Sequence, residues 1–441
     1  MTKRQMHLGF AMYNYGTHAG GWKLSQHDIA TNIAHFVKLA QRAEAAKFDM
    51  IFRADAPSSR IEDLDIRARN PGLNNAMEPL MFFSALSQAT THIGLASTLS
   101  TTFNPPYNLA RQLATLDHIS GGRAAWNAVT SAHPETAHNW GMDDLPPKAE
   151  RYARAREFVE VVKRLWDTYE DDAILHDVDG GYYFDPDKLH ITDFEGEHIK
   201  LYGALNVARC PQGRPVMIQA GASPDGLDFA AHEAEVIFAM TSTLEKSKQF
   251  YADMKARTVA AGRGENALKI VPGLNVIVAD SRAEAEARYR RLEDLTPDDV
   301  KAQHFSQQTS INVVGLPMDE PVPLEVIPPS TRMIKSFFER GIELIETRRT
   351  LREIVQEYSF RPNAVVMGTA AEISDHMEEW IDENAADGFN VITPYGAEGF
   401  YDFCDQVIPE LQRRGRFRTE YSGPTLRDHF GLERPEWRAY D

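Results

Sequence analysis

The sequence predicts a single (β/α)8 barrel that carries insertion segments. Short apolar runs alternate with amphipathic stretches along most of the 441 residues, which is typical of right-handed βαβ units. Eight of the runs qualify as strands, and eight units favour a closed barrel, although open sheets use the same unit. No internal repeat and no Ser/Gly-rich linker divides the chain, so we expect one domain over residues 1–441.

The predicted strands are short and almost continuously apolar, as expected for parallel strands that are covered on both faces. They are Met6–Met12, Asp49–Phe52, His92–Ser97, Ala124–Ala128, Val216–Gln219, Val236–Ala239, Ile270–Ala279 and Phe389–Thr393. Between strands, apolar residues recur every three or four positions, as on the buried face of a helix. This spacing predicts helices that include Ile29–Ala40 and Tyr152–Trp166.

Two segments interrupt the alternation, about residues 169–215 and 300–362. Both contain several glycines and prolines and show little helical period. Long irregular insertions in a compact domain are commonly lids or binding loops, and we expect the second segment to be a lid. The C-terminal extension, residues 399–441, is aromatic and charged, and could wrap the barrel or a neighbouring subunit.

Composition argues against several classes of protein. The net charge of −17 disfavours nucleic acid or an anionic membrane as partner, because a polyanion would be repelled. No apolar run approaches the ~20 residues of a membrane span, and residues 1–6 lead into a strand without a signal-peptide core. Two distant cysteines, Cys210 and Cys404, exclude a disulfide framework and a zinc finger. We therefore expect a cytoplasmic protein without a metal site.

The active site of such a barrel lies at the C-terminal ends of the strands. The residues expected there are mostly hydroxyls, amides and small side chains, which suit a polar heterocycle and a phosphate. Paired carboxylates for glycoside hydrolysis are missing, as are dinucleotide, P-loop, zinc-protease and nucleophile-elbow motifs. The polar candidates are Tyr13, Asn14, His18, Trp22, Asp55, Ser97–Thr102, Asn127, Thr130, Ser131, Ser223, Thr241 and Ser242.

Motifs at and beyond the C-terminal ends of the predicted strands resemble those of the luciferase-like flavin monooxygenases. The longest is Ala110–Ser131, which reads ARQLATLDHISGGRAAWNAVTS. The others, in chain order, are Phe52–Asp55, Ser97–Phe103, Asn139–Gly141, Glu150–Tyr152, Gln219–Ser223, Gly315–Asp319 and Ile408–Gly415. The series extends over almost the whole chain. It is most similar to the branch that contains nitrilotriacetate, EDTA, dibenzothiophene-sulfone and long-chain alkane monooxygenases and pristinamycin synthase.

The resemblance implies the large component of a two-component monooxygenase. In that family a separate NAD(P)H:FMN reductase supplies reduced FMN, O2 reacts at C4a of the ring to give a peroxyflavin, and one oxygen atom enters the substrate. The dry pocket that this chemistry needs is supplied by the protein. We also expect a homodimer or homotetramer.

The resemblance also implies where FMN would lie. Asp55 matches the residue beside the isoalloxazine, while Thr98 and Asn127 match residues that contact the ring. Tyr152 and Ser223 match positions that hold the phosphate and ribityl end. Relatives tend to have a histidine four residues before that tyrosine, and here the position is Lys148, whose ammonium could serve a phosphate as a point charge.

Structural roles compete with these assignments. Thr98 could cap the helix that follows, Tyr152 lies on the apolar stripe of its helix, and Ser223 before Pro224 is an equally good helix N-cap. Further candidates for the substrate pocket are His18, Trp22, Arg53 and His138.

Relatives usually have a neutral residue at the position of Arg53. Arg53 and Lys148 would suit an anionic substrate, such as a carboxylated amine or thioether that undergoes C–N or C–S cleavage. Three other hypotheses stay open: a deazaflavin-dependent dehydrogenase of the same superfamily, a non-catalytic FMN-binding protein, and a hydrolytic barrel enzyme.

Overall fold

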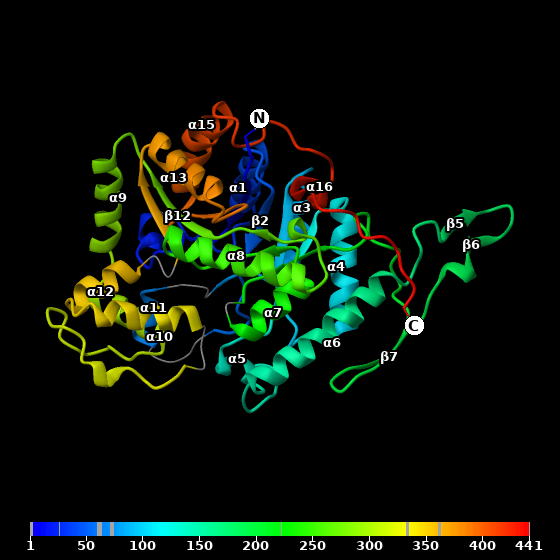
Figure 1. Cartoon of the computed structure of the whole chain (residues 1–441), viewed down its shortest axis with the longest axis horizontal. Helices are drawn as coiled ribbons and strands as arrows, with labels where there is room; N and C mark the ends of the chain where they lie inside the picture. The colour runs from blue at the N-terminus through cyan, green and yellow to red at the C-terminus, as the bar shows by residue number, and fades with distance from the viewer. Residues whose placement is uncertain are drawn as a thin grey trace.

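The main sheet of the protein has ten parallel strands. The structure, a computed structural model, describes residues 3–25, 27–59, 64–70, 75–221, 223–331, 335–359 and 363–440. The strand order is β11-β10-β9-β4-β3-β2-β1-β14-β12-β13 (Figure 1). The strands are β1 (His7–Ala11), β2 (Met50–Arg53), β3 (Gly94–Ser100), β4 (Ala124–Val129), β9 (Val216–Gln219), β10 (Val236–Ile237), β11 (Lys269–Ile270), β12 (Gly273–Val278), β13 (Ala364–Gly368) and β14 (Gly388–Ile392).

The segment that joins β11 to β12 closes this sheet into a barrel. On one side the N–H of Val271 donates to the carbonyl of Ile237 in β10, at 2.9 Å. On the other side the carbonyl of Pro272 accepts the N–H of Asn390 in β14, also at 2.9 Å. Because this segment bonds to β10 on one side and to β14 on the other, the strands form a ring, with β13 pairing on the outer side of β12, and the predicted barrel is confirmed.

One predicted strand, Ile270–Ala279, is wrong as a single element. It is divided at Val271 and Pro272 into β11 and β12, because proline has no N–H to donate to a neighbouring strand. Beyond the break, β12 pairs with β14 and then with β13. The sequence analysis did not predict β13, whose five residues directly follow the second insertion.

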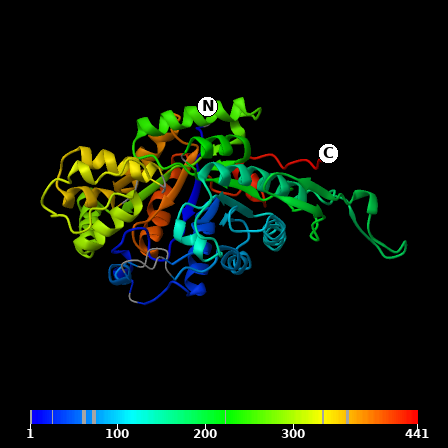
Figure 2. The ribbon, with the colours of Figure 1, turned by 90° about the horizontal axis from the view of Figure 1, so that it is seen from below.

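Helices surround the barrel (Figure 2). Helix α1 begins at Ile33 and not at the predicted Ile29, because the side chain of Asn32 accepts the N–H of His35 and caps the first turn. The predicted helix over Tyr152–Trp166 is confirmed as part of α6. The helices outside the second insertion are α1 (Ile33–Ala45), α2 (Leu64–Ala68), α3 (Pro79–Ser87), α4 (Pro106–Ser120), α5 (Pro134–His138), α6 (Lys148–Trp166), α7 (Pro224–Glu233), α8 (Leu244–Ala260), α9 (Arg282–Asp294), α13 (Ala370–Asp382), α14 (Ala397–Asp402), α15 (Ile408–Arg413) and α16 (Leu426–Phe430).

The first insertion forms two antiparallel hairpins. One pairs β5 (Ile174–Asp177) with β6 (Tyr182–Phe184), and the other pairs β7 (Thr192–Glu195) with β8 (Lys200–Gly203). The β5–β6 hairpin extends away from the barrel, whereas the β7–β8 hairpin lies against α6, where Phe194 and Leu201 pack on the core. No helix among the described residues is long and apolar enough to cross a membrane.

The second insertion is mainly helical, so the expectation of an irregular segment was wrong. It contains α10 (Asp298–Thr309), α11 (Lys335–Glu346) and α12 (Leu351–Tyr358), which bury a small core of their own that includes Phe305, Leu344 and Ile354. Its prolines gather between α10 and α11 and hide the helical period on either side. Residues 332–334 and 360–362 of this predicted insertion lie outside the described residues.

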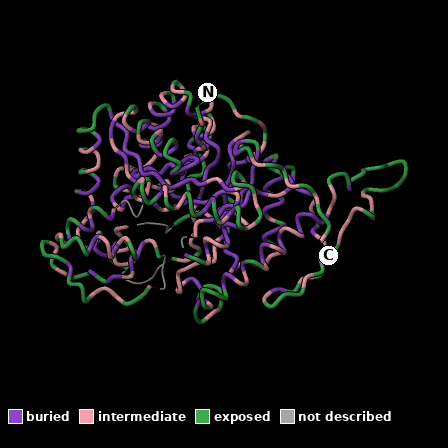
Figure 3. Tube along the Cα trace, in the orientation of Figure 1, coloured by how far each residue is buried: buried purple, intermediate pink, exposed green. Residues whose placement is uncertain are grey.

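The C-terminal extension wraps its own barrel. Leu426 and Phe430 of α16 pack with the small and apolar side chains inside the barrel, at the end where the strands begin. Further on, the indole N–H of Trp437 donates to the carbonyl of Asp167 at 2.8 Å. The strands of the barrel are buried along their length, as β3 and β12 illustrate (Figure 3). With this end filled, the open end of the barrel is the one at which the strands finish.

Candidate active site at the carboxyl ends of the strands

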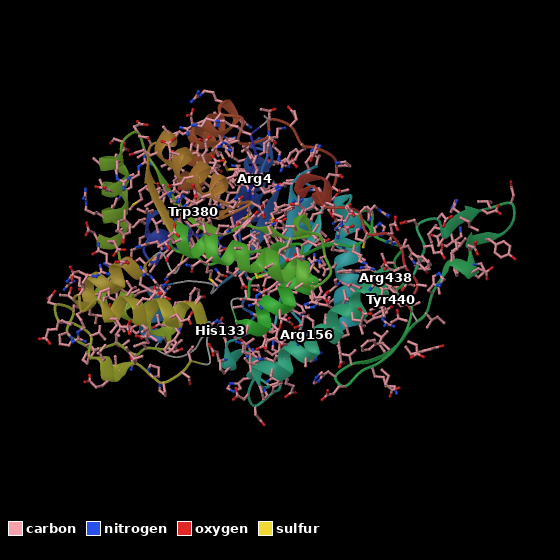
Figure 4. The ribbon with its side chains drawn as sticks, in the orientation of Figure 1. Arg4, His133, Arg156, Trp380, Arg438 and Tyr440 are labelled. Atoms are coloured by element: carbon pink, nitrogen blue, oxygen red, sulfur yellow. The ribbon has the colours of Figure 1, made fainter. Side chains whose placement is uncertain are left out.

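A cavity of about 1380 Å³ lies at the carboxyl ends of β3, β4 and β9 and is covered by α10 and α11 of the second insertion. Pockets for one small molecule usually measure about 300–1,000 Å³. The cavity therefore has room for a cofactor and a substrate together. His133, labelled in Figure 4, lines it from the start of α5.

Neutral hydroxyl and amide groups meet where β3 and β4 end. The Thr98 hydroxyl lines the cavity and donates to the carbonyl of Arg53 at 2.8 Å. The Asn127 side chain lies behind it and donates to the Thr98 oxygen at 3.0 Å. The other amide atom of Asn127, Oδ1, is buried and has no hydrogen-bond partner among the described residues. Asn127 itself does not line the cavity, and its contact with the lining is through Thr98.

Asp55 lines the cavity beside this group, at the end of β2. Burial raises the pKa of the Asp55 carboxyl to about 6, and the negative charge of Glu78 adds to the rise, whereas the positive charge of Arg53 opposes it. Glu78 itself is held in place as the N-cap of α3, where it accepts the N–H groups of Leu80 and Met81. Asp55 can therefore gain or lose a proton near neutral pH.

Arg53 lies beneath the cavity and does not line it. Its guanidinium is 4.3 Å from the centroid of the Phe82 ring and 5.4 Å from that of Phe36. It donates to Oδ1 of Asn14 at 3.1 Å. Burial lowers the pKa of Arg53 to about 10, with Asp55 opposing the change. Arg53 thus acts on the site through its charge and its packing.

The opposite end of the cavity is formed by the first turns of α6 and α7. Ser223 caps α7, and its hydroxyl accepts the N–H of Gly226 at 3.2 Å. A Cβ on Gly226 would lie 2.8 Å from the Tyr152 hydroxyl, so only glycine lets this turn approach Tyr152 so closely. Tyr152 and Ser223 both line the cavity.

Positive charge gathers at the same end. Lys148 lines the cavity from the start of α6, with Arg151 one turn further on and Lys335 at the start of α11. Burial lowers the pKa of Lys148, Asp225 opposes this, and the nearby charges of Arg151 and Lys335 lower it further. Cations beside a helix N-terminus form a binding site for an anion such as a phosphate.

Ser131 is a lining residue with an unusual backbone. Its φ is +58°, in the left-handed region that serine rarely adopts. The Ser131 hydroxyl bonds that of Ser100 at 2.8 Å, and the guanidinium of Arg151 donates to its carbonyl. Such conformations persist where surrounding contacts hold them, frequently at functional sites.

None of the four residues predicted for the substrate pocket lines the cavity, neither Arg53 nor the other three. His18 is buried, and its Nε2 lies 2.8 Å from a carboxylate oxygen of Glu293 in α9. The Trp22 indole donates to the carbonyl of Arg69 at 3.1 Å. His138 is exposed, and its Nε2 lies 3.0 Å from the carbonyl of Asp143. The structure thus brings Asp55, Thr98, Lys148, Tyr152 and Ser223 to the cavity, with Asn127 behind Thr98.

Several lining residues escaped the sequence analysis. The rings of Phe103 and Trp140 stack 5.5 Å apart and form an apolar wall. Trp140 and Arg151 lie in motifs on which the resemblance to the family is based, and those motifs could have identified them as lining residues. His304 of α10 and Phe338 of α11 come from the second insertion. No local pattern indicates which face of an inserted helix lies over a barrel.

The fold and the cavity define a class of protein, the (β/α)8 barrels that work at the carboxyl ends of their strands. Within that class, the family model described as luciferase-like monooxygenase matches residues 12–361, and the chain belongs to this family. The predicted resemblance is confirmed.

The chain is similar to characterised monooxygenases along its length. It is 42% identical over 444 residues to nitrilotriacetate monooxygenase component A of Aminobacter aminovorans, which covers 98% of each chain. It is 40% identical over 438 residues to N-acetyl-S-(2-succino)cysteine monooxygenase of Bacillus subtilis, again 98% of each. Among solved structures, riboflavin lyase with modified FMN and riboflavin superposes with a TM-score of 0.85 at 28% identity, over 98% of this chain and 97% of the other.

Proposed function

We propose that this protein is the oxygenase component of a two-component monooxygenase that uses reduced FMN and O2. The observation that carries the proposal is the two-ended cavity. One end offers Thr98 and a titratable Asp55, and the other offers Ser223 and Tyr152 beside the cations of α6 and α11. The relative from Aminobacter aminovorans is named as a component A, which supports a separate reductase that delivers the flavin.

The residues at both ends fit FMN. Lys148, Arg151 and the N-terminus of α7 would hold its phosphate. Thr98 and Asp55 would lie along the ring system. Asn127, behind the lining, would hold the Thr98 hydroxyl in place by donating to its oxygen.

When bound, reduced flavin supplies the electrons that activate O2. The chain's own residues exclude water and hold a proton. Helices α10 and α11 cover the cavity, and Phe103 and Trp140 provide an apolar wall. Asp55 can carry a proton at its carboxyl near neutral pH, because its pKa lies at about 6.

We further propose an anionic substrate, a carboxylated amine or thioether whose C–N or C–S bond is cleaved. The cavity lining includes four carboxyl groups, those of Asp55, Glu78, Asp144 and Glu339. Three of its cations, Lys148, Arg151 and Lys335, nevertheless lie close enough to one another to lower the pKa of Lys148, and they would favour an anionic group there. Arg53, first expected to contribute this charge, lies beneath the cavity. The two relatives described above are named for a carboxylated amine and a carboxylated thioether.

The test is turnover by the purified protein with a flavin reductase, NADH, FMN and O2. Carboxylated amines, carboxylated thioethers and neutral sulfones are supplied separately, and products are identified by mass spectrometry. We expect oxygenated or cleaved product from a carboxylated compound. No product from any compound would contradict the proposal, and tight retention of oxidised FMN without turnover would favour a flavin-binding protein. Turnover with a reduced deazaflavin under anaerobic conditions would favour the dehydrogenase.

A further inference from the structure

Arg53, the last residue of β2, is a buried cation beneath the candidate site. Side chains alternate between the two faces of a strand. Phe52 packs with the apolar side chains inside the barrel, and Arg53 points to the other face, towards the rings of α1 and α3. Arg53 is 3% exposed. Because arginine is almost never fully buried unless it is paired, its burial indicates that its charge is compensated.

In the described part of the chain, the direct contacts of the Arg53 guanidinium are with neutral groups. It donates to Oδ1 of Asn14 at 3.1 Å and to the carbonyl of Met77 at 3.4 Å. The rings of Phe82 and Phe36 lie against it. These contacts fix the position of the cation, and the ring faces attract it, but none of them carries a full negative charge. The compensating charge therefore comes from beyond direct contact.

That charge is the carboxylate of Asp55, which follows Arg53 by two residues and lines the cavity. Burial lowers the pKa of Arg53, and Asp55 opposes this effect. Burial and the charge of Glu78 raise the pKa of Asp55, and Arg53 opposes that rise in turn. Glu78 is fixed as the N-cap of α3. Asp55 is thus subject to one fixed positive charge and one fixed negative charge.

The other charged side chains of the cavity lining, and its two histidines, are not among the causes of the raised pKa of Asp55. They are Arg67 of α2, His133 before α5, Asp144 before α6, Lys148 and Arg151 of α6, His304 of α10, and Lys335 and Glu339 of α11. Arg53 is therefore the cation that favours the ionised form of Asp55.

We propose that Arg53 is a positioning residue for the reaction proposed above: its buried charge keeps the Asp55 carboxyl able to release a proton while an anion occupies the cavity. The inference rests on the proposed function, because FMN and an anionic substrate both bring negative charge to the cavity. Negative charge near a carboxyl favours its protonated form. Arg53 opposes this from outside the lining, where neither ligand displaces it. Its carbonyl also accepts the Thr98 hydroxyl at 2.8 Å, so one residue positions both groups at this end.

The test is a titration of the Asp55 carboxyl in the ligand-free protein by infrared difference spectroscopy, in which the Asp55 band is the one that Asp55→Asn removes. Arg53→Met keeps the length of the side chain without its charge, and is expected to move the midpoint upwards by about one pH unit. Arg53→Gln is a second neutral variant, with the same expected direction. Arg53→Lys keeps the charge and is expected to titrate like the unmodified protein. Arg282→Met removes an exposed charge of α9 and is the control.

The pH dependence of turnover connects this titration to the reaction. It is measured with pre-reduced FMN and no reductase, so that the pH dependence of a reductase does not enter. The pH–rate profile of Arg53→Met is expected to move upwards by the same amount as the infrared midpoint, and that of Arg53→Lys to stay in place.

The outcomes separate this inference from the proposed function. An Asp55 midpoint that stays in place in both neutral variants overturns the inference and leaves the proposed function standing. A midpoint that moves without the pH–rate profile also overturns it, because the reaction would not depend on the protonation of Asp55. Absence of product from the unmodified protein would contradict the proposed function, and the inference with it.

Discussion

Asp55 is a carboxyl group whose protonation depends on its surroundings more than on its own chemistry. Its pKa is raised from 3.8 to about 6, first by burial and then by Glu78. The folded protein therefore binds this proton more tightly than the unfolded chain does. The stability from that proton is fully present below pH ~4 and is lost as pH rises through 6. At pH 7 the ionised carboxylate destabilises the fold by on the order of 3 kcal/mol.

Asp55→Asn is accordingly expected to raise the free energy of unfolding at pH 7 by about 3 kcal/mol. The gain over the wild type should vanish below pH ~4, where both side chains are neutral. Urea denaturation between pH 4 and 8 measures it, with exposed Glu325→Gln on the second insertion as control. A difference that does not change with pH would show that the environment of Asp55 is not the one described.

Ser223→Ala is expected to weaken the binding of FMN about tenfold, which corresponds to ~1.4 kcal/mol, and to leave riboflavin binding almost unchanged. The reason is that Ser223 lies at the end assigned to the phosphate, which riboflavin lacks. Thr243→Ala is the matched control, because Thr243 caps α8 with the same kind of bond, to the N–H of Lys246. Fluorescence titration measures both ligands. Equal losses for FMN and riboflavin would contradict the assigned position of the phosphate.

The site residues that could be predicted from the sequence are those inside long motifs. Asp55, Thr98 and Tyr152 belong to such motifs and line the cavity. His18 was chosen only because it follows a strand, and the strand order does not tell in which direction a loop turns. His18 turns towards α9 and pairs with Glu293.

At the scale of elements, one buried ion cluster ties the loop after β1 to the second insertion. Glu293 of α9 pairs with His18 at 2.8 Å and with Lys301 of α10 at 2.9 Å. Burial by itself would raise the pKa of Glu293, but these two partners more than offset it, and its pKa is lowered. The cluster stabilises the fold above the ordinary pKa of glutamate and loses that effect on acidification. It positions the helices that cover the cavity.

Glu293→Gln is expected to lower the free energy of unfolding by about 3 kcal/mol at pH 7, because it leaves Lys301 and His18 buried without their carboxylate. Glu286→Gln on the same helix is the control. Glu286 forms an exposed i,i+4 pair with Arg282, and its loss should cost less than about 0.5 kcal/mol. Chemical denaturation measures both, and hydrogen exchange in α10 should accelerate in the first variant alone. Equal effects would contradict the role of the cluster.

The elements themselves were largely predictable. Most strands of the barrel are buried on both faces, and their continuous apolar runs mark them in the sequence. The errors in the predicted strands and helices have local causes. Pro272 divides a run that looks like one strand, and β13 is five residues long beside a segment without clear period. In the second insertion, the apolar faces of α11 and α12 pack on each other and on α10.

At the scale of the whole molecule, the parts that surround the barrel have separate tasks. The C-terminal extension fills the end where the strands begin, and the second insertion covers the end where they finish. The β5–β6 hairpin of the first insertion projects to one side (Figures 1 and 2), and none of its residues lines the cavity.

The most direct test of the central claim is the fate of molecular oxygen in a single turnover. The protein is loaded with reduced FMN under anaerobic conditions, without reductase, and mixed with ¹⁸O2 and the carboxylated substrate identified by turnover. Mass spectrometry is then expected to find one labelled oxygen atom in the product and the other in water. Product formed without label, or product formed in the absence of O2, would contradict the assignment of this cavity as a flavin monooxygenase site.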